Sequence, residues 1–162
     1  MNIPKEKTAC FTGHRVIDPS LQDTVLTNTK RVIAALYKKG YRCFIAGGAI
    51  GFDTIAANAV LSARDYYGDI RLELYLPCKG QDAKWSNEQK EEYQRILSLC
   101  DEYKFISEVY TPGCMHERNR AMVEASSACV AYIKQDRGGS AYTVDFARKN
   151  GLACFNVALM EE

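Results

Sequence analysis

The sequence has no apolar run that approaches the ~20 residues needed to span a bilayer. Its first residues, 1–7, are polar and lack the apolar stretch that a secretory signal peptide carries. An excess of one charge is also missing, because 21 basic and 20 acidic residues give a net charge of +1. We therefore expect a cytoplasmic protein with no membrane contact. The near-neutral balance makes nucleic acid a less favoured partner than a small molecule.

Cysteine motifs are lacking as well. The seven Cys are dispersed, odd in number and without a C-x-x-C pair, which disfavours both a disulfide framework and a metal site. Neither a G-x-G-x-x-G fingerprint nor the Gly-Lys-Ser/Thr ending of a P-loop occurs. We therefore expect no metal and no cofactor, and a chain of 162 residues without repeats or linkers is expected to form a single domain, residues 1–162.

What the sequence does contain is a regular alternation of strand and helix patterns. Predicted strands cover residues 8–11, 42–46, 71–76 (ended by Pro77), 103–106, 128–133 and 152–157, and predicted helices cover residues 19–39, 52–67, 87–99, 115–126 and 141–150. Such alternation is typical of right-handed βαβ units. We therefore predict an α/β fold: a three-layer, Rossmann-like domain with a mostly parallel sheet of about five to six strands and helices on both faces.

Glycine-bearing turns follow three of the predicted strands, and strand ends of a parallel sheet form the rim where ligands bind. In the first turn, Gly13 permits tight backbone geometry, Thr12 offers a hydroxyl, and Arg15 can bind phosphate in a forked geometry. The alternative is a polar turn with a solvated Arg. His14 fits a proton donor, a base-stacking group or a plain turn residue.

The second turn carries Gly47, Gly48, Ala49 and Gly51, followed by Asp53. Its glycines suit a backbone that a phosphate or ribose approaches closely, although a turn can require Gly for steric reasons alone. Asp53 lies in the first helical turn, where it can interact with the helix dipole or accept ribose hydroxyls.

The predicted helix 115–126 carries Arg118, Asn119 and Arg120 near its start. Cations at a helix N-terminus oppose the dipole, so an anionic ligand would explain them, whereas a solvated cluster offset by Glu117 is the simpler alternative.

The third turn is formed by Gly138, Gly139 and Ser140, with Thr143 one turn further on. A helix that opens on two glycines can present free N–H groups to an anion, although Ser140 can also serve as an ordinary N-cap. Trp85, the one Trp, either stacks on a base or covers a helix edge.

Taken together, these motifs resemble a known superfamily. The stretches 47–53, 118–120 and 139–147 look like the G-x-A-x-G-I-D turn, R-N-R helix start and G-S-x-x-T segment of the DNA-processing protein DprA. The segment His116-Glu117-Arg118 with Met122 is similar to the LOG phosphoribohydrolases. Both groups belong to the SLOG superfamily, and the opening T-G-H-R and the Trp85 loop look most like its YpsA-like branch.

The resemblance implies a nucleotide or nucleotide derivative, such as an ADP-ribose or nucleoside-monophosphate moiety, as the ligand of a binding protein or sensor. A LOG-type nucleotide hydrolase is the first alternative, but Asp145 stands where LOG enzymes carry a catalytic Glu. A DprA-like protein that binds single-stranded DNA is the second. Because related folds form dimers, a homo-oligomer is also implied, with no face specified.

Overall fold

The sheet of the computed structural model, which describes residues 2–160, is built from six strands that all run parallel, in the order β4-β3-β2-β1-β5-β6. The strands are β1 (Thr8–Gly13), β2 (Cys43–Ala46), β3 (Arg71–Cys78), β4 (Glu102–Ser107), β5 (Ala128–Tyr132) and β6 (Ala153–Asn156). The predicted α/β class, with its mostly parallel sheet, is confirmed.

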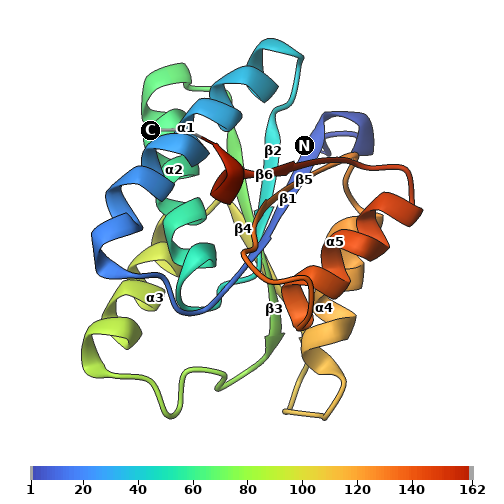
Figure 1. Ribbon diagram of the computed structural model, residues 1–162. Coiled ribbons are helices and arrows are strands. Elements are labelled where there is room, and N and C mark those ends of the chain that lie inside the picture. Colours follow the sequence, from blue (N-terminus) through green and yellow to red (C-terminus); the bar gives the residue numbers. More distant parts are fainter. Residues whose placement is uncertain (1, 161–162) are drawn as a thin grey trace.

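Helices cover both faces of this sheet, which makes the predicted three layers (Figure 1). They are α1 (Gln22–Lys38), α2 (Phe52–Tyr67), α3 (Asn87–Leu99), α4 (Cys114–Glu124) and α5 (Gly139–Lys149). Figure 1 shows α1, α2 and α3 on one side of the sheet and α4 and α5 on the other. None of the helices within residues 2–160 is long and apolar enough to cross a membrane.

The alternation of side chains along the strands supplies a separate core to each face. Phe11 and Phe44 face α1–α3, with their ring centroids 6.2 Å apart. Cys10, Ile45 and Cys129 face the α4–α5 side. All five residues of β5 are buried, as expected for a strand covered on both faces.

The order of the strands reverses at β1. From β1 the chain builds outward through β2 and β3 to β4, and then returns to place β5 on the other side of β1. The loops that leave the carboxyl ends of β1 and β5 therefore diverge to opposite faces, and this switch point is where open α/β sheets hold ligands.

Some element boundaries differ from those expected. Strand β3 runs through Pro77 to Cys78, although proline was expected to end it. The Arg71 amide donates to the Arg42 carbonyl, so the backbone groups of Arg71 point toward β2. Because this direction alternates along a strand, the backbone of Pro77 points toward β2 as well. Strand β2, however, pairs with β3 only as far as Ala46. The missing N–H of Pro77 therefore breaks no ladder bond. Residues 19–21, expected to begin the first long helix, form a separate 3-10 turn.

Three cysteines lie side by side across β1, β5 and β6, since Cys129 pairs in register with both Cys10 and Cys154. A hydrogen bond from the Cys129 thiol lowers the pKa of the half-buried Cys154 thiol to about 7, against a smaller opposing effect of burial, and the charge of Arg148 adds to the lowering. In Cys100, the other half-buried thiol, burial raises the pKa.

Cys154 should therefore be the thiol that reacts first in the folded protein. The thiolate is the nucleophile, so alkylation by iodoacetamide should reach half of its maximal rate near pH 7 at Cys154 and only at alkaline pH at Cys100. Peptide mapping by mass spectrometry measures both rates in one sample, and Cys154→Ser identifies the signal. Identical pH profiles for the two thiols would contradict this assignment.

Candidate functional site

A cavity of about 500 Å³ opens at the switch point, at the carboxyl ends of β1 and β5. Its walls come from four segments: the loop after β1, the start of α2 with its preceding loop, the first turns of α4, and the loop from β5 into α5. The lining residues are Thr12, Gly13, His14, Arg15, Ala49, Asp53, Met115, Arg118, Asn119, Gln135, Arg137, Gly138, Gly139 and Ser140.

Two glycines hold the loop after β1 against the start of α2. A Cβ on Gly13 would come within 2.5–2.7 Å of the side chain of Phe52, and one on Gly51 would overlap the backbone carbonyl group of Arg15. The Phe52 amide donates to the His14 carbonyl at 3.1 Å. These close contacts fix the position of Arg15 at the mouth of the cavity.

Arg118 and Asp53 form a buried pair of opposite charges behind this loop, with 5% and 7% of their surfaces exposed. The Arg118 guanidinium donates to the Gly47 carbonyl, and its Nε donates to Asn119 Oδ1 at 2.8 Å. The Asp53 carboxylate accepts from the Ala49 amide at 3.2 Å. A Cβ on Gly47 would lie 2.6 Å from Arg118 Nη1 and 2.8 Å from Asp53 Oδ2, so glycine is required between the two charges.

Burial dominates the titration of both groups. It raises the pKa of the Asp53 carboxyl, against the opposing effects of the Arg118 charge, the Ala49 amide and the Arg15 charge. Burial likewise lowers the pKa of Arg118, against the attraction of Asp53. The cavity lining contains three arginines, Arg15, Arg118 and Arg137, and one carboxylate, that of Asp53, so the cavity attracts anions.

The N-terminus of α5 opens into the same cavity. The helix begins at Gly139, two residues earlier than expected, and its N-cap is Gly138, a residue with no side chain to cap it. Ser140 therefore lies inside the first turn and is not the N-cap that its sequence also allowed. The first N–H groups of this helix and its positive dipole end are thus directed to the cavity, where Gly138, Gly139 and Ser140 all lie.

His14 is held in one orientation. Its Nε2 accepts a hydrogen bond from the Lys134 amide at 2.8 Å, and its ring packs edge-on against Tyr132. Neutral His14 therefore carries its proton on Nδ1, because Nε2 is the acceptor. This arrangement ties the loop after β1 to the loop after β5 across the mouth of the cavity.

Several residues that we expected at the site are not among those that line the cavity. Gly47, Gly48 and Gly51 pack against other parts of the protein: a Cβ on Gly48, whose φ is +73°, would overlap the side chain of Leu76. Trp85 packs edge-on against Tyr93, with ring centroids 5.3 Å apart, which places it in the α3 layer. Thr143 is buried and donates to the Gly139 carbonyl at 2.9 Å.

Arg120 also turns away from the cavity. It is exposed, and its Nη2 donates to the Tyr142 hydroxyl at 2.7 Å. Helical geometry explains this, because residues two apart project from a helix about 200° apart. The same periodicity brings in Met115, three residues before Arg118, which we did not single out. Gln135 and Arg137, which also line the cavity, carried no periodic signal because they belong to the loop after β5.

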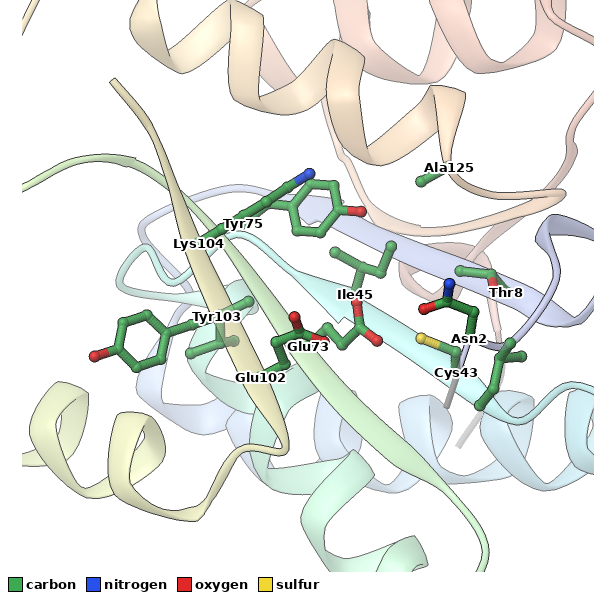
Figure 2. Close-up of a pocket in the computed structure, with 12 residues that line it drawn as sticks. Asn2, Thr8, Cys43, Ile45, Glu73, Tyr75, Glu102, Tyr103, Lys104 and Ala125 are labelled. Carbon is green, nitrogen blue, oxygen red and sulfur yellow. The ribbon is translucent and has the colours of Figure 1, made fainter. Parts of the chain in front are cut away.

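The protein has two further hollows, one beside the site and one at the other end of the sheet. Arg15 also lines one of about 530 Å³ whose other walls include Glu88 and Glu92 of α3, so that hollow is acidic where the first is basic. The other, of about 270 Å³, lies at the amino ends of the strands, between residues such as Thr8, Cys43, Glu73 and Glu102 (Figure 2). Within residues 2–160, no group of three His, Cys, Asp or Glu side chains is placed to hold a metal ion.

The parallel sheet, its two helical layers and the cavity at its switch point define the class of the protein, a Rossmann-like α/β domain. Solved structures agree with this class. DNA processing protein A (DprA) from Streptococcus pneumoniae matches with a TM-score of 0.66 and 18% identity over 94% of the chain, which spans half of that protein. DprA from Helicobacter pylori, whose structure concerns single-stranded DNA binding, matches with a TM-score of 0.55 and 18% identity over 94% of this chain and 77% of that one.

Sequence comparison identifies the family. The family model of the YspA SLOG family matches residues 18–155, and the chain belongs to this family. The SPbeta prophage-derived protein YoqJ of Bacillus subtilis is 31% identical over 144 residues, which cover 82% of both chains. A UPF0398 protein of Bacillus thuringiensis is 28% identical over 125 residues, 75% of this chain and 68% of the relative. The resemblance to the YpsA-like branch of the SLOG superfamily is thereby confirmed.

Proposed function

We propose that this protein binds a nucleotide or a phosphorylated nucleotide derivative in the cavity at the switch point. The observation that carries the proposal is the meeting of an uncapped helix N-terminus, that of α5, with Arg15, Arg118 and Arg137 in one cavity. Free helix N–H groups and guanidinium forks are two of the groups with which proteins commonly bind phosphate. A volume of about 500 Å³ lies in the range of small-molecule sites.

The charges around Arg15 also suggest how such a ligand lies. The phosphate belongs in the basic cavity, because Glu88 would repel it from the neighbouring hollow, where Glu92 is already paired with Arg95. The exocyclic amines of a base, by contrast, could donate to the Glu88 carboxylate. A ligand that extends past Arg15 would therefore place its base on the acidic side.

The cavity favours binding over hydrolysis. Asp145, which corresponds to the catalytic Glu of LOG enzymes, is exposed on α5, outside the cavity lining. Asp53 lies in the lining, but the buried Arg118 and the Ala49 amide already engage it. Hydrolysis thus remains the second candidate, and incubation of any bound nucleotide followed by chromatography tests it.

Gly139→Asp tests the phosphate position directly. A Cβ at this position would come within 4 Å of no side chain or backbone atom outside its chain neighbours and its own helix among the described residues, and an acid in the first helical turn favours the dipole, so the fold should be kept. The new carboxylate would occupy the place of the phosphate, and we expect affinity for AMP or ADP-ribose to fall about tenfold or more through charge repulsion. Isothermal titration calorimetry and thermal shift measure this loss.

Gly139→Asn is the matched control, because it has the same shape without the charge. A ligand present at one hundred times its Kd adds about 2.7 kcal/mol of stability, so wild type and Gly139→Asn should both show a clear thermal shift. Equal binding by the Asp and Asn variants would show that the phosphate does not bind at the N-terminus of α5.

Single-stranded DNA is the second ligand class to test, because the H. pylori DprA that shares this fold binds it. DNA carries the same phosphate, so both classes would respond to Gly139→Asp. Binding to an oligonucleotide that weakens steeply with salt, together with no thermal shift from mononucleotides, would favour the DNA role.

A further inference from the structure

The exposed edge of the sheet at β4 is the second notable surface of this molecule. Strand β4 pairs with β3 on one side and is the last strand of the sheet on the other. Its first three residues, Glu102, Tyr103 and Lys104, are all exposed. Among residues 2–160, four of the eight exposed large hydrophobic side chains lie in the stretch around this strand: Leu99, Tyr103, Val109 and Tyr110.

The backbone of β4 offers hydrogen bonds at alternate residues. The Asp101 amide donates to the Leu72 carbonyl of β3 at 2.9 Å, so the backbone of Asp101 faces the sheet. Because direction alternates along a strand, the N–H and C=O groups of Glu102 and Lys104 point outward. An exposed edge of this kind is a template for another strand.

The charges on this edge are self-complementary. We propose that two copies of the chain associate through their β4 strands, antiparallel and centred on Tyr103, to form one continuous sheet. In this register Glu102 lies opposite Lys104 of the second copy, and Lys104 opposite Glu102, so two ion pairs form about a twofold axis. The same two residues supply the outward backbone groups, so the charge pairs and the hydrogen-bonded pairs coincide.

Neighbouring registers do not share this property. A twofold axis at Glu102 would set Glu102 against its own copy, and one at Lys104 would set two lysines together. Charges on an edge strand usually discourage pairing with another strand. The order Glu-Tyr-Lys instead selects one register and excludes its neighbours.

The side chains are already placed for this contact. Glu102 and Lys104 project to the same sheet face, where Arg71 Nη2 lies 3.0 Å from Glu102 Oε2. On this face Lys104 Nζ lies 4.2 Å from the Tyr75 ring centroid (Figure 2). Tyr103 belongs to the opposite face, with its ring edge-on to Phe105. The pairing would bring the two Tyr103 side chains together beside the twofold axis and cover apolar surface there.

Lys104→Glu tests the proposal, because it leaves like charges opposite one another at every pair. Sedimentation equilibrium over a wide range of protein concentration should show a monomer–dimer equilibrium for wild type. The variant should have a dissociation constant raised about tenfold or more. The double variant Glu102→Lys/Lys104→Glu restores opposite charges and should dimerise again. Lys30→Glu makes the same charge change at an exposed residue of α1 and should leave the dimer unaffected.

A monomeric wild type at every concentration, or a Lys104→Glu variant that dimerises as wild type does, would overturn the proposal. Urea unfolding of each variant verifies that it is folded, and a folded double variant that stays monomeric would also count against the register. Nucleotide binding should be unchanged in Lys104→Glu, because β3 and β2 separate β4 from β1. Failure of the dimer and failure of the ligand proposal are therefore distinguishable.

Discussion

Gly51→Ala should destabilise the protein by about 2–6 kcal/mol, the largest effect that we expect from adding a single methyl group. Gly51 has φ +79° and ψ −127°, a conformation that is essentially restricted to glycine and that costs other residues about 1–3 kcal/mol. Its new Cβ would also lie 2.6 Å from Arg15 Cα and would overlap the carbonyl group, and such overpacking adds about 1–3 kcal/mol. Urea denaturation followed by circular dichroism measures the loss.

Gly68→Ala separates the two causes. Gly68 also has a positive φ, +87°, at the end of α2, but its Cβ would meet nothing within 4 Å among the described residues. We expect a loss of about 1–2 kcal/mol there, from the backbone conformation alone. If the two variants prove equally stable, the contact between Gly51 and the loop after β1 is not a constraint on the fold.

Arg118→Met should cost about 3–5 kcal/mol of folding stability and abolish binding of the proposed ligand. The substitution keeps a long apolar side chain but leaves Asp53 buried without its counter-charge, and removal of one member of a buried pair has this magnitude. Arg120→Met is the matched control on the same helix: Arg120 is exposed, and we expect little change in stability and normal binding.

The pH dependence of Arg118→Met identifies Asp53 as the source of the loss. Burial already raises the pKa of Asp53 in the folded state, and loss of the Arg118 charge raises it further. Between the ordinary carboxyl pKa and the raised one, the folded variant binds a proton that the unfolded chain does not, so its stability increases as the pH falls through this interval. The deficit relative to wild type should therefore be smaller in mildly acidic buffer than at neutral pH. The double variant Asp53→Asn/Arg118→Met should show no such dependence.

Local sequence patterns were sufficient to predict the helices, the strands and the three-layer class. Periodicity and strand composition depend on which face each residue buries, and this information is local. The order of the strands is not local: β5 must return past three strands to pair with β1. Nothing in residues 128–132 indicates that β5 pairs with β1 and not with β4. The order of the strands was therefore known only from the structure.

The candidate site was partly predictable for a related reason. Thr12 to Arg15 and Gly138 to Ser140 line the cavity because they follow adjacent strands, as the strand-end rule predicts. The glycines of the second turn carry the same local signal, yet Gly47 and Gly51 accommodate Arg118 and the backbone of Arg15. Glycine indicates that something approaches closely, and only the structure shows whether this is a ligand or the protein itself.

The central place of β1 also affects how the chain folds as it leaves the ribosome. Strand β1 is synthesised first among the strands, and β2 follows soon enough to pair with one of its edges. The backbone groups of its other edge, which bond to β5 in the finished protein, stay unpaired until residues 128–132 have been made. During synthesis of α2 to α4 this edge is open to strands of other nascent chains. The unpaired edge of β1 during this period, like the exposed β4 edge of the finished fold, is therefore a site where aggregation can begin.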